Sequence, residues 1–353
     1  MSKVLMKGSE ALGEAALLAG CKFYFGSPVT TQSELPSYLA KRMPQVNGIF
    51  SQAENEVSAI NMVYGAACAG ARVLTSNSGP DVSSKQEGIA YIASSELPCV
   101  IVNIMRGGPE ANNNNPSQTD YWQATRGHGD YRTIVYAPAS VQEMADFTVS
   151  AFDYADKFRN PVIILADGIV DSMMEPVELP QKVEYDINSK EWALGYPGNH
   201  RNICASVLED SQEQEVKNWT LYQKYQEIAE YFANNQELAV EEFMCDDADI
   251  VLVGYGIIAR VLKTVVEKCR KRGIKAGLIR PKILWPFPSE AIRKVADKVP
   301  LFMVVEMSYG QMVEDVKIAV NGKKPVYFFG RTGGAVPSDF EILSEVQKLV
   351  NPD

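Results

Sequence analysis

The sequence predicts an α/β protein in which helices and strands alternate to form doubly wound parallel sheets. Continuous apolar runs of strand length, such as CVIVNI at residues 99–104 and PVIIL at residues 161–165, are typical of parallel strands that are buried on both faces. Longer segments with apolar residues at helical spacing separate these runs. Strands and helices that alternate in this way form a sheet with helices on both faces.

The first half of the chain contains the predicted elements of one such sheet. We expect helices at about residues 8–20, 33–42, 54–70 and 88–93, strands at 22–25, 48–50, 72–75, 99–104 and 161–165, and a loop at 76–80. Ligands bind to doubly wound sheets at the carboxyl ends of the strands. The loops that we expect to hold a site are therefore 26–33, 51–56, 76–84 and 105–130.

A region of different character follows at residues 179–247, which lack the alternation that is typical of strands. Most of the segment 213–243 is charged and is predicted to be helical. Its predicted apolar stripe consists of Trp219, Tyr222, Tyr225, Ile228 and Phe232. We interpret this region as a linker whose long helix packs across two domains.

A second and smaller α/β unit is predicted after the linker. Strands are expected at residues 249–255, 275–279, 301–306 and 326–329, helices at 258–272 and 291–295, and an aromatic-proline turn at 285–288. The predicted organisation is a first domain at 1–178, a linker at 179–247 and a second domain at 248–353. Two domains also agree with the length of 353 residues, which exceeds that of most single domains.

Composition and charge exclude several classes of protein. Apolar residues make up 46% of the chain and charged residues 22%, as in soluble globular proteins. The net charge of −10 argues against nucleic acid or an anionic membrane as the main partner. Glu10 and Glu14 interrupt the apolar N-terminal segment, which excludes a signal peptide. Because no apolar run approaches the roughly 20 residues that cross a bilayer, we expect a cytoplasmic protein.

The cysteines and histidines predict that this chain has no metal site of its own. The six cysteines are Cys21, Cys68, Cys99, Cys204, Cys245 and Cys269. None forms a CxxC pair, whereas iron–sulfur clusters and structural zinc sites need closely spaced thiolates. Most of these cysteines have apolar neighbours and are expected to be small core residues. With only His128 and His200, a histidine-based site is not expected either.

Glu56, with Glu54 beside it, is the best candidate for a catalytic acid. Both follow a short predicted strand and lie at the start of a predicted helix. A carboxyl group at this edge of the sheet can exchange a proton with a ligand, and a buried apolar setting would favour its protonated form. The alternative is structural, because acids in a first helical turn complement the helix dipole, and Ser51 with Glu54 fits a capping box.

Two further loops contain candidates. Hydroxyl groups in the segment Ser27-Pro28-Val29-Thr30-Thr31 can donate hydrogen bonds to an oxyanion or a cofactor ring. The alternative for that segment is a turn that ends in a helix N-cap. Arg106 follows the strand CVIVNI and precedes two glycines, so its planar fork could bind a carboxylate. The alternative for Arg106 is a surface arginine in a tight turn.

Two glycine-containing segments are weaker signals. The loop Thr75-Ser-Asn-Ser-Gly-Pro80 could hold an anion through its backbone N–H groups. Gly254-Tyr255-Gly256 follows a predicted strand, as in dinucleotide-binding loops, but lacks the rest of that fingerprint.

Taken together and in this order, these loops resemble the pyrimidine domain of 2-oxoacid:ferredoxin oxidoreductases, which are thiamine diphosphate enzymes. The matching motifs are Val29-Thr30-Thr31 after Ser27-Pro28, the stretch QAENEVSAINMVYG at 52–65, TSNSGP at 75–80 and RGGP at 106–109. The second domain, with its Gly-Tyr-Gly and Trp-Pro-Phe-Pro motifs, resembles the transketolase C-terminal-like domain of these subunits. The resemblance therefore implies a thiamine-diphosphate-binding (pyrimidine-type) domain followed by a transketolase C-terminal-like α/β domain.

The resemblance implies a role for each of the candidate residues. Glu56 would hydrogen-bond N1′ of the aminopyrimidine and favour the imino form that takes the C2 proton. Thr30, in one loop with Pro28 and Val29, would contact the cofactor near its thiazolium ring and the substrate. Arg106 would bind the substrate carboxylate.

The resemblance also implies partner subunits. Thiamine diphosphate is normally held through Mg²⁺ by a Gly-Asp-Gly motif and a downstream asparagine. Ala166-Asp167-Gly168 lacks the first glycine, and Asn188 lies in a polar segment, so we interpret the former as a strand-end turn. The implied partners are a diphosphate-binding thiamine subunit with the Mg²⁺, a ferredoxin-like subunit with iron–sulfur clusters, and a gamma-type subunit. Thiamine diphosphate would then lie at a subunit interface, and ferredoxin and coenzyme A would be reactants.

The segment 115–132 looks most like the branched-chain members of the family, which act on 3-methyl-2-oxobutanoate (2-ketoisovalerate). The tract from Asn112 to Asn115 departs from the usual glycine-rich pattern near the substrate. The same reaction on 2-oxoglutarate or pyruvate therefore remains open. A non-catalytic α/β scaffold and a decarboxylase or transketolase-type enzyme without electron transfer are the alternatives of other classes.

Overall fold

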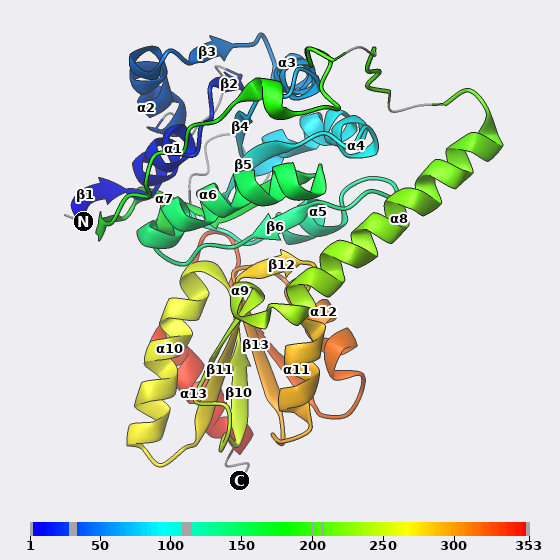
Figure 1. Ribbon diagram of the computed structural model, residues 1–353. Coiled ribbons are helices and arrows are strands. Elements are labelled where there is room, and N and C mark those ends of the chain that lie inside the picture. Colours follow the sequence, from blue (N-terminus) through cyan, green and yellow to red (C-terminus); the bar gives the residue numbers. More distant parts are fainter. Residues whose placement is uncertain (1–2, 28–33, 108–114, 199–200, 206–207, 351–353) are drawn as a thin grey trace.

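The computed structural model describes residues 3–27, 34–107, 115–198, 201–205 and 208–350, and Figure 1 shows that they form two lobes. Within these residues the strands form a seven-stranded sheet, a five-stranded sheet and a two-stranded sheet. The seven-stranded sheet has the order β12-β6-β7-β5-β4-β2-β3, and the five-stranded sheet has the order β14-β13-β10-β11-β9. The doubly wound α/β class that the apolar runs predict is confirmed.

The first lobe is built on the seven-stranded sheet. Its strands are β2 (Phe23–Gly26), β3 (Ile49–Gln52), β4 (Val73–Ser78), β5 (Cys99–Met105), β6 (Ile134–Tyr136), β7 (Pro161–Asp167) and β12 (Ile283–Trp285). Its helices are α1 (Gly8–Leu18), α2 (Glu34–Arg42), α3 (Glu56–Cys68), α4 (Gln86–Ser94), α5 (Tyr121–Arg126), α6 (Val141–Phe158) and α7 (Gly168–Ser172), with the 3-10 helices η1 (Met43–Val46) and η2 (Gly79–Lys85). The strands are parallel except β12, which is antiparallel to β6. The two-stranded sheet pairs β1 (Val4–Lys7) with β8 (Met174–Val177).

The central strands are buried over their whole length. Every residue of β5 and β7 is buried, as their continuous apolar sequences predict. Strand β4 is also fully buried, although its sequence VLTSNS ends in four polar residues. The prediction of a loop from residue 76 was therefore wrong, because β4 continues to Ser78 in register with β5. A buried strand end with polar side chains is the first structural sign of a site.

The second lobe is built on the five-stranded sheet. Its strands are β9 (Val240–Phe243), β10 (Ile250–Val253), β11 (Ala276–Pro281), β13 (Phe302–Glu306) and β14 (Val326–Gly330), and its helices are α10 (Gly256–Lys271), α11 (Ser289–Ala296), α12 (Met312–Val320) and α13 (Asp339–Val350). All of its strands run parallel except β9, which is antiparallel to β11. The linker region thus contributes a strand that its sequence did not predict.

The linker contains η3 (Ile187–Ser189), the long helix α8 (Ser211–Asn234) and the short helix α9 (Gln236–Ala239). Figure 1 shows α8 passing diagonally from beside the first lobe to the junction between the lobes. Tyr225, Ile228 and Phe232 are buried as predicted, but Trp219 and Tyr222 are 60% and 52% exposed. The predicted stripe fails at these two positions because the N-terminal part of α8 projects away from the sheets (Figure 1).

Gln118, a fully buried residue, joins the two lobes by hydrogen bonds. Its side-chain amide donates to the carbonyl of Tyr255 (3.0 Å) and accepts from the N–H of Met307 (3.0 Å). Nearby, the hydroxyl of Tyr121 donates to Asp315 at 2.7 Å. The segment after residue 115 is therefore a packed junction between the lobes, and β12 continues that junction by adding to the sheet of the first lobe.

Five of the six cysteines are buried, and Cys204 is partly buried. The prediction that most cysteines are core residues is confirmed. The described residues also contain no helix that is long and apolar enough to cross a membrane.

Candidate active site

Glu56 is the first residue of α3, at the edge of the sheet where β3 ends. The helix is capped by Asn55, whose side chain accepts a hydrogen bond from the N–H of Ser58 at 2.8 Å. The capping box of Ser51 with Glu54 is therefore wrong, and Glu54 is exposed. With the N-cap supplied by Asn55, the Glu56 carboxylate is not needed to cap the start of the helix.

The Glu56 side chain contacts a buried lysine that the sequence did not single out. Nζ of Lys85 lies 2.7 Å from Oε2 of Glu56, and the Lys85 side chain is 0% exposed. The same Nζ donates to Oγ1 of Thr75 (2.8 Å) and to the carbonyl of Ser76 (3.0 Å). The setting of the Glu56 carboxylate is therefore not apolar, because the Lys85 ammonium group faces it. Burial lowers the pKa of Lys85, and the Glu56 carboxylate opposes that shift.

Arg106 directly follows β5, and its side chain is only 6% exposed. The alternative of a surface arginine in a tight turn is wrong. Its side chain packs against Gly79, where an added Cβ would lie 2.7 Å from Cγ of Arg106. Its guanidinium lies 4.0 Å from the carboxylate of Asp81. The glycine that follows β4 thus makes room for a cation at the carboxyl ends of β4 and β5.

Three buried polar side chains lie beside this cation. Asn77 and Asn103 are paired in register on β4 and β5, and Nδ2 of Asn103 donates to Asp120 at 3.1 Å. Both amide atoms of Asn77 and Oδ1 of Asn103 have no hydrogen-bond partner among the described residues. Burial raises the pKa of Asp120 to about 6, against the hydrogen bond from Asn103 and the positive charge of Arg106. Buried polar atoms without partners are costly and are typical of ligand sites.

The structure therefore brings two of the predicted residues, Glu56 and Arg106, into one cluster of alternating charge. Its described members are Glu56, Lys85, Asp81, Arg106, Asp120, Asn77 and Asn103. Asp81 connects the two halves, because the charges of both Arg106 and Lys85 act on its carboxylate, although burial has the larger effect and raises its pKa. Of the predicted loop 27–31, Ser27 is buried, whereas Pro28, Val29 and Thr30 lie outside the described residues.

Sequence reasoning missed Asp81, Lys85 and Asp120, and one signal could have found them. Strand β4 begins with apolar residues and ends with polar ones, at the edge of the sheet where ligands are expected. A polar strand end of this kind makes the charged residues in the turn that follows it candidates for the same site.

Asp120 provides a test of the cluster through stability. Because its pKa in the folded chain is about 6 against an ordinary value of 3.8, ionising it costs folding energy. The cost is absent below about pH 4, grows as the pH rises through about 4 to 6, and is complete above that range. We expect Asp120→Asn to raise the free energy of unfolding by up to about 3 kcal/mol at pH 8 and by little at pH 4. Urea unfolding at both pH values measures this difference.

The matched control for that prediction is Asp130→Asn, at an exposed position of the same segment. The control should leave the free energy of unfolding nearly unchanged at both pH values. If Asp120→Asn raised the free energy of unfolding equally at pH 4 and pH 8, ionisation of the buried Asp120 carboxyl group would not be the cause of the gain.

Asp167, at the end of β7, acts as a structural anchor. Its Oδ1 accepts from the N–H groups of Ile169 (3.1 Å) and Val170 (3.0 Å), which caps α7. Its Oδ2 accepts from the N–H of Ile257 in the second lobe at 2.8 Å. Backbone donors therefore occupy both oxygens, in accordance with the interpretation of Ala166-Asp167-Gly168 as a strand-end turn.

Gly256 explains part of the Gly-Tyr-Gly motif. It has a φ of +56°, and an added Cβ would lie 2.7 Å from Oδ2 of Asp167. A glycine is needed there for the left-handed backbone and for the close approach to Asp167. The motif therefore has a packing role at the junction of the lobes.

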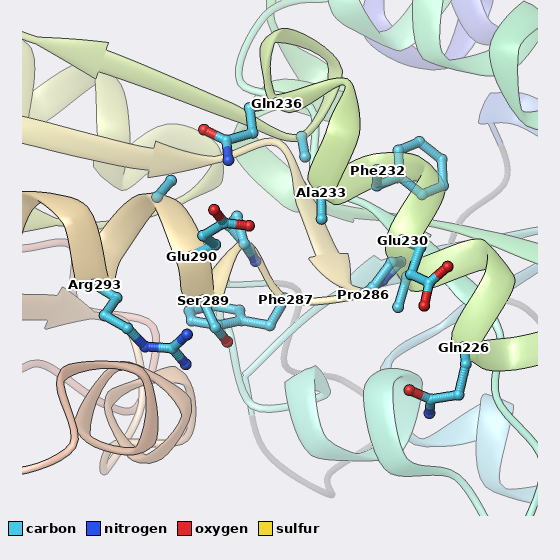
Figure 2. Close-up of a pocket in the computed structure, with 14 residues that line it drawn as sticks. Gln226, Glu230, Phe232, Ala233, Gln236, Pro286, Phe287, Ser289, Glu290 and Arg293 are labelled. Carbon is cyan, nitrogen blue, oxygen red and sulfur yellow. The ribbon is translucent and has the colours of Figure 1, made fainter.

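A concave surface lies elsewhere, between α8 and the start of α11. This cavity has a volume of about 450 Å³. Figure 2 shows side chains from α8, Gln236 and the segment 286–293 around it. Its lining includes none of the candidate residues. Within the described part of the chain, no three His, Cys, Asp or Glu side chains form a group that could hold a metal ion.

Comparisons with known proteins agree with this architecture. A model of the family described as pyruvate flavodoxin/ferredoxin oxidoreductase, thiamine diphosphate-binding, matches residues 14–244. A model of the pyruvate:ferredoxin oxidoreductase core domain II matches residues 248–342. The junction of the two matches falls just before β10.

Two curated relatives are similar over nearly their whole length. The ketoisovalerate oxidoreductase subunit VorB of Methanothermobacter marburgensis is 46% identical over 99% of this chain and 98% of the relative. The 2-oxoglutarate synthase subunit KorA of Archaeoglobus fulgidus is 36% identical over 94% of this chain and 95% of the relative. Both are named as subunits.

Two solved structures share the fold. The 2-oxoglutarate:ferredoxin oxidoreductase of Magnetococcus marinus aligns with a TM-score of 0.84 and 22% identity, over 99% of this chain and 66% of that chain. A split-gene transketolase, as an inactive beta4 tetramer, aligns with a TM-score of 0.62 and 13% identity over 98% of both chains. The fold is thus that of a thiamine diphosphate-binding domain followed by a transketolase C-terminal-like domain, and the chain belongs to the 2-oxoacid:ferredoxin oxidoreductase family.

Proposed function

We propose that this chain provides the pyrimidine-facing half of a thiamine diphosphate site, in an enzyme that oxidatively decarboxylates 3-methyl-2-oxobutanoate. The observation that carries the proposal is the position of Glu56, a partly buried carboxylate at the start of α3 beside a buried polar cluster. The unpartnered amide atoms of Asn77 and Asn103 in that cluster fit a ligand that carries both donors and acceptors, as an aminopyrimidine does.

Each residue has a distinct part in the proposed reaction. Glu56 holds a proton at its carboxylate and exchanges it with N1′ of the aminopyrimidine. Arg106 orients the substrate by binding its carboxylate, and Thr30 lies in the loop that contacts cofactor and substrate. When bound, thiamine diphosphate supplies the carbon nucleophile and the electron sink for decarboxylation.

The preference for a branched-chain acid rests on the relatives. The VorB relatives are 46% and 44% identical to this chain, whereas the KorA relatives of similar length are 32–36% identical.

The remaining parts of the enzyme would come from partners. The chain has no CxxC motif, and backbone amides occupy the Asp167 carboxylate. A diphosphate-binding thiamine subunit would hold the Mg²⁺, and a ferredoxin-like subunit would carry the iron–sulfur clusters. A gamma-type subunit would complete the complex. Coenzyme A would accept the acyl group, and ferredoxin would accept the electrons in the cytoplasm.

The proposal is tested by co-expression of this chain with its partner subunits and an anaerobic assay of viologen reduction. The 2-oxoacids to compare are 3-methyl-2-oxobutanoate, 2-oxoglutarate and pyruvate, each with coenzyme A. We expect thiamine-dependent reduction by the complex, none by the isolated chain, and the highest kcat/KM for the branched-chain acid. Preference for another acid would overturn the substrate, and no reduction by an intact, cofactor-loaded complex would leave the scaffold alternative.

A further inference from the structure

We propose that Lys85 is a positioning residue for the reaction, which holds the Glu56 side chain in a fixed orientation toward the cofactor. The inference rests on the proposed role of Glu56. The contact joins η2, which follows β4, to the first residue of α3. No sequence motif predicts it, because Lys85 lies outside the short motifs 27–31, 52–65, 75–80 and 106–109 that carry the resemblance of the first domain.

The contacts of Lys85 are one ion pair and two hydrogen bonds. Nζ of Lys85 lies 2.7 Å from Glu56 Oε2 in the ion pair, and it donates to Thr75 Oγ1 at 2.8 Å and to the Ser76 carbonyl at 3.0 Å. The side chain is thus a buried cation that faces the Glu56 carboxylate.

The contact determines how Glu56 meets a ligand. Lys85 contacts Oε2 of Glu56, so Oε1 is the oxygen that could face N1′ of the cofactor. The Glu56 side chain is 12% exposed. The ion pair fixes the orientation of the Glu56 carboxyl group, so that this group need not reorganise during proton transfer.

Stability alone does not explain a lysine at this position. A buried ion pair is often no more stabilising than apolar side chains of similar volume. Methionine has an unbranched chain of similar length and would avoid the cost of burying an ammonium group. The charge of Lys85 is thus better accounted for by its effect on Glu56 than by packing.

The experiment replaces Lys85 in the reconstituted complex, as Lys85→Met and as Lys85→Gln. The glutamine keeps donors for Thr75 and Glu56 but removes the charge. For both variants we expect kcat to fall by roughly tenfold to a hundredfold, with the KM of the 2-oxoacid nearly unchanged. Equilibrium titration should show weaker binding of thiamine diphosphate.

Coupling to Glu56 separates this role from a structural one. In a Glu56→Gln background, the Lys85 substitutions should cause almost no further loss of kcat. The matched control is Lys190→Met, which removes another largely buried lysine that is paired with an acid, Asp156. The control should lower thermal stability but keep kcat near that of the parent at temperatures where the complex is folded.

Two results would overturn the inference. One is wild-type kcat and unchanged binding of thiamine diphosphate in both Lys85 variants, provided that they fold. The other is a sign that Lys85 is purely structural. That sign would be a loss of kcat that is additive with the loss in Glu56→Gln, or failure to fold of both Lys85 variants and of the double variant Lys85→Met/Glu56→Gln. If Glu56→Gln itself kept full activity, the proposed function would fail instead, so the two failures are distinguishable.

Discussion

Replacement of Glu56 by Gln should lower kcat of the reconstituted complex by roughly a hundredfold to ten-thousandfold, the usual contribution of a general acid–base residue. Glutamine has nearly the same shape as glutamate and can still hydrogen-bond N1′, but it cannot exchange a proton with it. Because the change acts on proton transfer, the KM of the 2-oxoacid should change little. Steady-state viologen reduction with a saturating 2-oxoacid measures both quantities.

Glu54→Gln is the matched control, since it changes an exposed acid two residues away in the same segment. It should keep kcat within about twofold of the parent, because surface substitutions rarely perturb a distant site. Equal losses in the two variants would show that the segment tolerates no amide, and full activity of Glu56→Gln would remove the proposed role.

Glu56→Gln also leaves Lys85 without its counter-charge, so stability must be measured beside activity. Removal of one partner of a buried ion pair costs about 3–5 kcal/mol, although a glutamine oxygen can still accept a hydrogen bond from Nζ. A thermal unfolding scan of each purified complex shows whether it remains folded at the assay temperature. Only activities measured well below the unfolding transition bear on the role of Glu56.

Replacement of Asp167 by Ala should cause the largest loss of stability, about 3–5 kcal/mol. The substitution removes the acceptor of three backbone N–H groups, those of Ile169, Val170 and Ile257. An unsatisfied buried donor costs about 1–3 kcal/mol, and Asp167 is fully buried. Since Ile257 belongs to the second lobe, loss of its hydrogen bond to Asp167 should also weaken the coupling between the lobes and broaden the urea transition.

Asp210→Ala is the control for this prediction. Asp210 caps α8 by accepting from two backbone N–H groups, those of Gln212 and Glu213, at 2.9 Å each. It therefore has the same capping bonds as Asp167, but on an exposed helix and without a bond to another lobe. We expect a loss of about 1 kcal/mol. Losses of similar size in the two variants would mean that Asp167 is a cap and no more.

The main sheet of the protein was predictable from sequence because its signals are local. The runs CVIVNI and PVIIL are almost entirely apolar, and an apolar strand of that length is typical of a sheet that is buried on both faces. Glu56 and Arg106 were also candidates, since each lies in a loop that follows a predicted strand at the edge where ligands bind. The stripe of α8 failed at Trp219 and Tyr222, because helical spacing does not reveal how far a helix projects from its neighbours.

What the sequence by itself determined is the fold class and the two charged residues at the edge of the first sheet. Only the tertiary structure showed that Lys85 faces Glu56 across 29 positions and that Asp167 binds the second lobe at Ile257, 90 positions away. Local patterns record whether a residue suits a helix, a strand or a turn. The partner of a buried charge is decided by packing between elements that are distant in the chain, and a single sequence carries no local mark of that pairing.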